Sequence, residues 1–182
     1  MNTQNIETKE PRSKRGLFCT QTNIVYIILI ILIISLRCVF EPINIVGRSM
    51  EPTYIDGDIC IVYKLYDDYQ YGDIITIKTE SRGKIIKRII GLPGDVIEIK
   101  NSTVYRNGEA LDEPYTHEGQ YRGFLTDEPV TVKPGHIIVL GDNRPESADS
   151  RSPDIGQVPF ENIIGKCEIR LFNMHTILNR DN

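Results

Sequence analysis

The sequence KIIKRIIGLPGDVIEIK, residues 84–100, has the pattern of two β-strands joined by a tight turn. Isoleucine and valine dominate both flanks, and β-branched residues favour extended backbone. Pro93-Gly94 lies between the flanks and is typical of turns, because proline fixes φ and glycine accepts a positive φ. The stretch therefore predicts strands over residues 84–90 and 96–100.

The same pattern continues through most of the chain beyond residue 40. Short runs rich in β-branched residues alternate with Gly, Pro, Asp and Asn, which indicates a mainly β, antiparallel fold. Asn107-Gly108 supplies the positive-φ pair of a hairpin turn. The polar residues 115–128 are expected to form an exposed excursion. The further strand candidates are residues 43–46, 58–64, 73–79, 103–106, 130–132, 136–140 and 165–172.

An apolar segment precedes this β-rich region. Residues 24–36 read IVYIILIILIISL, and the run extends to Phe40 if Arg37 snorkels toward the membrane interface. The extended run is close to the minimum of about 17 residues for a membrane-spanning helix. A cleaved signal peptide is the alternative, but no small-x-small cleavage site follows the segment.

We favour a retained helix, which divides the chain into three parts. Residues 1–20 are expected to be a basic cytoplasmic tail, residues 21–40 a transmembrane helix, and residues 41–182 an extracytoplasmic β domain. This orientation follows from the positive-inside rule, because the basic residues gather before the apolar segment.

Charge and cysteine content exclude several classes of protein. The formal net charge is −4, and the tail at 1–20 is net basic, so the remainder is acidic and offers no basic face for nucleic acid. The cysteines Cys19, Cys38, Cys60 and Cys167 show no metal-binding spacing, so neither a metal nor a cofactor is expected. Cys60 and Cys167 are interpreted as small buried hydrophobic residues, and a disulfide between them is the less favoured alternative.

A serine lies about nine residues beyond the apolar segment, in the string GRSMEPT at 47–53. An isolated serine in a loop usually serves as a cap or turn residue. Its position supports a second interpretation, because chemistry at Ser49 would take place at the membrane surface. Ser49 is therefore a candidate nucleophile.

Lys87 and Arg88 interrupt the isoleucines of the strand at 84–90. Because side chains alternate between the faces of a strand, one of the two should face the interior or a cleft, and we favour Lys87. Burial would lower the pKa of the lysine amine, and only lysine of the two can lose its proton. A neutral lysine could activate Ser49 as a nucleophile, whereas none of the three histidines lies in a triad motif.

The polar run GDNRPESADSR at 141–151 follows the apolar strand at 136–140. A solvated loop is the simplest interpretation. Its density of hydrogen-bonding groups also suits residues that orient a catalytic site. In that case Asp149 and Arg151 could pair, and Ser147 could hydrogen-bond an amine.

Three strings occur in order, namely SMEPT at 49–53, KRIIGLPGD at 87–95 and GDNRPESADSR at 141–151. Together they resemble the main motifs of bacterial type I signal peptidases, and FEP at 40–42 and GKCE at 165–168 fit as well. The resemblance extends from about residue 24 to residue 172. The small size and single apolar segment are more similar to the Gram-positive form.

The resemblance implies an antiparallel β, signal-peptidase-like catalytic domain that removes signal peptides after small-x-small motifs. Ser49 would be the nucleophile, and Lys87 the general base that later protonates the leaving amine. Ser147 would hold the Lys87 amine in place. Further support would come from Asp142, Asp149 and Arg151. The positions that match the family's substrate-binding residues are Ile43, Ile45, Val46, Met50 and Ile86.

The implied partners are signal peptides of secreted preproteins and membrane lipid, with the export machinery as a further candidate; nucleic acid is not among them. The implied location is the cell membrane. One departure concerns the oxyanion hole, because many Gram-negative members carry a hydroxyl residue where this chain has Gly47. The alternatives are a pilus-type Ser/Lys maturation peptidase, a self-cleaving repressor-type protease, and a non-catalytic membrane-anchored scaffold.

Overall fold

The computed structural model describes residues 15–116 and 128–171, with side chains from residue 23 onward. The chain forms two compact units, Met1–Cys38 and Val39–Asn182. The basic tail expected at 1–20 lies largely outside the described residues, and the helix begins at Arg15 rather than at residue 21.

The first unit contains one helix, α1 (Arg15–Val39). Its apolar side chains between Ile24 and Leu36 are exposed, and Arg37 in the last turn complements the negative end of the helix dipole. Among the residues that the structure describes, no helix combines the length and the apolar character required to cross a membrane. The expected helix is therefore present, and its crossing of a membrane stays a prediction.

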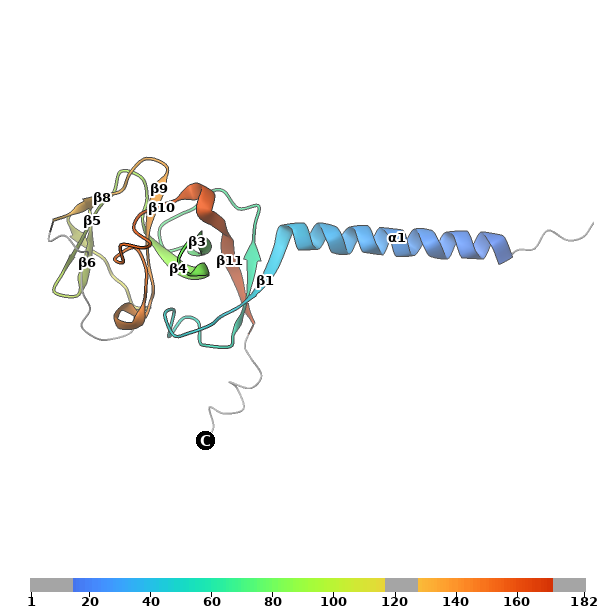
Figure 1. The fold of residues 1–182 in the computed structure, drawn as a ribbon, viewed down its shortest axis with the longest axis horizontal. Helices are drawn as coiled ribbons and strands as arrows, with labels where there is room; N and C mark the ends of the chain where they lie inside the picture. Colours follow the sequence, from blue (N-terminus) through green and yellow to red (C-terminus); the bar gives the residue numbers. More distant parts are fainter. Residues whose placement is uncertain (1–14, 117–127, 172–182) are drawn as a thin grey trace, which may run out of the picture. The chain divides into compact units, whose positions relative to one another are not determined.

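The second unit consists of two antiparallel sheets (Figure 1). The larger sheet has seven strands in the order β1-β2-β11-β3-β4-β9-β10, and the smaller has four in the order β7-β6-β5-β8. The larger sheet contains β1 (Phe40–Asn44), β2 (Ile59–Tyr63), β3 (Ile74–Thr79), β4 (Gly83–Gly91), β9 (His136–Leu140), β10 (Val158–Pro159) and β11 (Ile163–Leu171). The smaller sheet contains β5 (Val96–Lys100), β6 (Thr103–Arg106), β7 (Glu109–Ala110) and β8 (Val130–Thr131). Two 3-10 turns, η1 (Arg144–Glu146) and η2 (Phe160–Asn162), complete the described elements.

The mainly β antiparallel fold is confirmed, with differences at the first strand. The sequence predicts a strand at 43–46, whereas β1 covers Phe40–Asn44 because its register pairs Phe40 with Tyr63 and Asn44 with Ile59. Beyond Asn44 the backbone leaves the ladder, and Gly47 adopts a φ of 86°, which favours glycine. The short strands β7 and β10 were not predicted, since two residues show no periodicity.

Strand β4 contributes to all three hydrophobic clusters of the second unit. Ile86 belongs to the first cluster, Ile89 to the second and Ile90 to the third. The two adjacent basic residues in the second half of β4, an interior strand, are both buried, with Lys87 3% and Arg88 9% exposed. The expectation that only one of them faces the interior is therefore wrong.

The smaller sheet is inserted between β4 and β9 and packs through the third cluster, which includes Ile97, Val104 and Leu140. The chain enters and leaves this smaller sheet at one place, because the Val132 N–H, just after β8, donates to the Asp95 carbonyl, just before β5, at 2.8 Å. A Cβ on Gly91 would come within 2.8 Å of the Ile97 side chain. Glycine at the end of β4 therefore allows the two sheets to approach closely.

Candidate active site

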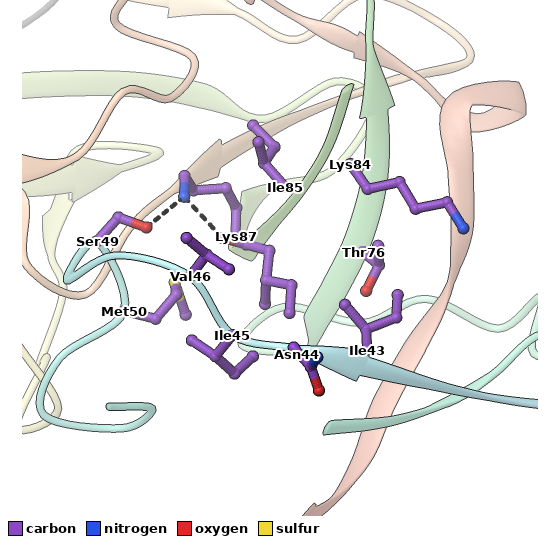
Figure 2. A pocket seen from close by; sticks show the side chains of 11 residues that line it. Ile43, Asn44, Ile45, Val46, Ser49, Met50, Thr76, Lys84, Ile85 and Lys87 are labelled. Atoms are coloured by element: carbon purple, nitrogen blue, oxygen red, sulfur yellow. Dashed lines mark hydrogen bonds between the residues drawn. The ribbon is translucent and has the colours of Figure 1, made fainter. Parts of the chain in front are cut away.

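A cleft of about 140 Å³ lies where the end of β1 approaches the first half of β4 (Figure 2). In the described ladder, β9 pairs with β4 only from Arg88 onward, so residues 83–87 of β4 have an unpaired edge on that side. The cleft is lined by Ile43, Asn44, Ile45, Val46, Ser49, Met50, Thr76, Lys84, Ile85, Ile86 and Lys87. It therefore combines apolar walls with a few polar groups.

Ser49 and Lys87 meet at one end of this cleft (Figure 2). The Lys87 Nζ atom donates to Ser49 Oγ at 2.8 Å and to the Ile86 carbonyl at 2.7 Å. Burial lowers the pKa of Lys87 to about 8, while the negative charges of Asp149 and Asp142 act in the opposite direction. With this pKa about a tenth of the amine is neutral at pH 7. The neutral amine can accept the hydroxyl proton of Ser49.

Asp142 ties the segment after Ser49 to strand β4. Its carboxylate accepts two hydrogen bonds from the guanidinium of Arg88, at 2.8 and 2.6 Å, and another from Thr53 Oγ1. The neighbouring Asn143 N–H donates to the Ser49 carbonyl at 3.1 Å. This loop therefore holds the backbone of Ser49 beside the strand that carries Lys87.

Asp149 and Arg151 stabilise the same loop from within. The buried carboxylate of Asp149 accepts from the Gly141 N–H at 3.0 Å and from the Arg151 guanidinium at 2.8 Å. Arg151 also donates to the Arg144 carbonyl at 2.7 Å. These bonds tie residues 141–151 together, and most of the segment is buried or half-buried rather than the solvated loop of the simplest interpretation.

Ser147 is close to the site, but it does not make the expected bond. Its Oγ atom is buried and has no hydrogen-bond partner among the described residues. A Cβ on Gly141 would lie 2.2 Å from Ser147 Oγ and 2.4 Å from the Ser49 carbonyl oxygen. Ser147 therefore packs on Gly141, and the Ile86 carbonyl takes the second hydrogen bond of the Lys87 amine.

Glu113 and Tyr115, which the sequence did not indicate, support the loop at 141–151. The fully buried guanidinium of Arg144 donates to the Glu113 carboxylate at 2.6 and 3.0 Å and to the Gly141 carbonyl at 2.9 Å. Tyr115 donates to Glu113 at 2.9 Å, and the Arg88 guanidinium lies 3.8 Å from the centre of its ring. No local pattern marks these residues, since Glu113 and Arg144 are 31 positions apart.

The backbone near Ser49 bears on the oxyanion hole. The Gly47 N–H donates to Asp56 Oδ1 at 2.6 Å, so it is engaged away from the Ser49 side chain. The Ser49 N–H has no acceptor among the hydrogen bonds of the described residues. Ser49 can therefore supply one backbone donor, and the second donor for this chain is not Gly47.

The five residues matched to substrate binding, Ile43, Ile45, Val46, Met50 and Ile86, all line the cleft together with Ser49 and Lys87. Val46 is 87% exposed, whereas Met50 and Ile45 belong to the first hydrophobic cluster. Their role in substrate binding stays a prediction. Cys60 and Cys167 lie in the same cluster as free thiols.

Comparison with known proteins shows one family. The family described as signal peptidase, peptidase S26, matches residues 19–172. A signal peptidase I of Bacillus licheniformis is 34% identical, covering 96% of this chain and 99% of that protein. One from Bacillus caldolyticus is 41% identical, covering 72% of this chain and 79% of that protein. The crystal structure of a signal peptidase I from Enterococcus faecalis is 32% identical, with a TM-score of 0.49 over 56% of this chain and 98% of that one.

Proposed function

Because the chain belongs to the signal peptidase family, peptidase S26, we propose that it cleaves signal peptides from exported preproteins with Ser49 as nucleophile and Lys87 as general base. The observation that carries this proposal is the 2.8 Å contact between Lys87 Nζ and Ser49 Oγ inside a cleft. The lowered pKa of about 8 for the buried Lys87 supports it, since a base must be able to lose its proton.

The chemistry follows from these two side chains. The neutral Lys87 amine takes the proton of Ser49 as Oγ attacks the carbonyl carbon of the residue before the scissile bond. The resulting ammonium gives a proton to the leaving amine, and an ester remains on Ser49. Lys87 then takes a proton from the water that attacks the ester, and the ammonium returns a proton to Ser49 Oγ as the signal peptide is released. In both steps the Ser49 N–H serves as one donor to the oxyanion, a role supported by its lack of another acceptor among the described residues.

The cleft suits an extended substrate. Strand β1 is the edge of the larger sheet, and residues 83–87 of β4 have an unpaired edge, so a substrate strand can add its backbone hydrogen bonds here. In an extended strand, the residues at −1 and −3 point to the same wall. That wall carries Ile43, Ile45 and Ile86, and the small volume favours Ala, Gly or Ser at both positions.

We further propose that α1 anchors the chain to the membrane, with the basic tail in the cytoplasm and residues 41–182 outside. The exposed isoleucines and leucines between residues 24 and 36 support this anchoring, because apolar side chains prefer lipid to water. Protease added to intact protoplasts should digest the catalytic domain and spare a tag at the amino terminus. Protection of the catalytic domain instead would contradict the orientation.

A direct assay tests the peptidase proposal. The full chain in detergent is incubated with a fluorogenic peptide that contains an Ala-x-Ala site, and the products are identified by mass spectrometry. Cleavage is expected after the second alanine, and Ser49→Ala should abolish it while the circular dichroism spectrum is unchanged. Equal turnover by Ser49→Ala would exclude Ser49 as the nucleophile, and no turnover by the native chain would favour a non-catalytic scaffold.

A further inference from the structure

An ion pair lies at the end of the cleft away from Ser49. Lys84 Nζ on β4 contacts Glu41 Oε1 on β1 at 2.5 Å, and Lys64 Nζ lies 3.8 Å from the other oxygen of the same carboxylate. Figure 2 shows the Lys84 amine beyond Ile43, at the opposite side of the view from Ser49 and Lys87. Lys84 is one of the residues that line the cleft.

Strand periodicity relates this pair to the pockets for −1 and −3. Lys84 precedes Ile86 by two positions on β4, and Glu41 precedes Ile43 by two positions on β1. Side chains two positions apart share a face and are separated by about 7 Å along the strand. A substrate that places −3 against Ile43 therefore places its −5 side chain beside Glu41, and the Lys84 side chain reaches the same carboxylate.

We propose that Lys84 and Glu41, with Lys64 beside them, form a polar subsite that selects the −5 residue of the signal peptide. This inference rests on the extended binding mode proposed above. It adds a preference for the side chain at −5 to the preferences at −1 and −3. The subsite favours an acidic or hydrogen-bonding side chain at −5, and it disfavours an apolar or basic one.

The charges of the trio explain this preference. Lys84 and Lys64 both contact the Glu41 carboxylate, so a substrate carboxylate at −5 meets an ammonium group. Lys84 is 48% exposed at its side chain and can turn toward a substrate carboxylate, while Lys64 keeps Glu41 paired. A leucine at −5 would remove water from charged groups without replacing their hydrogen bonds, and a lysine would meet like charge.

Substitution of Lys84 tests the subsite with four peptides that differ only at −5, where they carry Glu, Gln, Leu or Lys. The native chain should cleave the Glu peptide about two- to fivefold more efficiently than the Lys peptide, as expected for a partly exposed ion pair. The difference should appear in KM rather than kcat, and it should shrink between 50 and 500 mM salt. Lys84→Glu should cleave the Lys peptide more efficiently than the Glu peptide, and Lys84→Gln should cleave the two with similar efficiency.

Lys100→Gln is the matched control, because Lys100 also pairs with a glutamate, Glu98, but lies on β5 in the smaller sheet. It should keep the native order of the four peptides. If both Lys84 variants cleave with the native order, the subsite is excluded and the peptidase proposal stands. If the native chain cleaves none of the peptides, both proposals fail together. Melting curves show whether Lys84→Glu is folded, and Lys84→Gln provides the test if it is not.

Discussion

The Nζ atom of Lys87 lies 2.8 Å from the Oγ atom of Ser49, although the two residues are 38 positions apart in the chain. Neither residue alone fixes this distance. The Asn143 N–H holds the Ser49 carbonyl, and Asp142 holds Arg88, the next residue after Lys87 on β4. The loop that follows β9 therefore sets the geometry of the catalytic pair.

The first prediction concerns the protonation of Lys87. Lys87→Arg should be inactive, because a guanidinium keeps its proton and cannot act as a base. In the native chain, activity should rise with pH through about 8, since the neutral fraction of the amine rises there. Single-turnover rates between pH 6 and 10 measure this. A rate that is flat over this range, or an active Lys87→Arg variant, would rule out the general-base role.

The second prediction concerns stability. The folded chain lowers the pKa of Lys87 from 10.5 to about 8, so below pH 8 it bears the full cost of holding a buried ammonium. The cost declines as pH rises from 8 to 10.5, because the unfolded chain binds more protons in that range. Lys87→Met should therefore increase the unfolding free energy at pH 7 by about 1–3 kcal/mol, after allowance for the lost hydrogen bonds.

Urea unfolding at pH 7 and pH 10.5 checks the stability prediction. The increase in unfolding free energy of Lys87→Met over the native chain should be absent at pH 10.5. Ser49→Ala serves as the control, because it keeps Lys87 and should therefore keep the native dependence on pH. A gain of equal size at both pH values would show that it arises from packing and not from the charge.

The third prediction concerns Gly141. An alanine Cβ there would lie 2.2 Å from Ser147 Oγ and 2.4 Å from the Ser49 carbonyl oxygen, so the Ser49 backbone must move. Displacement of a nucleophile by a fraction of an ångström to one ångström can cost about a hundredfold in rate. Gly141→Ala should therefore lower kcat strongly in the peptide assay. The double variant Gly141→Ala/Ser147→Gly should recover only part of the rate, since the contact with Ser49 remains; complete recovery would contradict the backbone argument.

The fourth prediction concerns the carboxylate that binds Arg144. Glu113→Ala removes this partner from a fully buried guanidinium, which typically costs about 3–5 kcal/mol. Denaturant unfolding should show this loss, together with a fall in kcat. Glu98→Ala removes the partner of an exposed lysine and should cost about 1 kcal/mol or less. Equal losses in the two variants would show that the buried pair has no special role.

The fifth prediction concerns the pocket for −1. Phenylalanine at −1 should lower kcat/KM by more than about tenfold relative to alanine, because the cleft has a volume of about 140 Å³. The same substitution at −2 should be tolerated, since that side chain points away from the wall. Ile86→Ala should enlarge the pocket and improve cleavage of the Phe peptide. A native chain that cleaves Ala and Phe peptides equally would exclude these pockets.

Much of the fold was predictable because strand periodicity is a local property. Strands β5, β6 and β9 have the predicted bounds, and β4 differs only by the glycines at its ends. The end of β1 was not predictable, because the apolar residues Ile43, Ile45 and Val46 continue past it and the register with β2 decides where pairing stops. The burial of both Lys87 and Arg88 depends on the position of β4 inside the sheet, which no local pattern specifies.

The site was predictable only where motifs fall in recognisable strings. Ser49, Lys87, Asp142, Asp149 and Arg151 lie in such strings, and the structure brings them together. Tyr115 begins the stretch that the sequence indicates to be an exposed excursion, and Glu113 lies just before it. Long-range pairing with Arg88 and Arg144 makes both residues half-buried. The packing of Ser147 on Gly141 also depends on tertiary contacts alone.

The hydrogen bond between Val132 and Asp95 joins the two ends of the chain segment at 96–131. Since Asp95 and Val132 are already hydrogen-bonded, the corresponding segment of another family member could be grafted between them without separating β4 from β9. Glu113 and Tyr115 would leave with the removed segment, although their partners Arg144 and Arg88 remain in the host. A working chimaera must therefore reintroduce an acid and an aromatic ring at those two places, and its inserted sheet must also fit the third hydrophobic cluster around Ile90, Ile138 and Leu140.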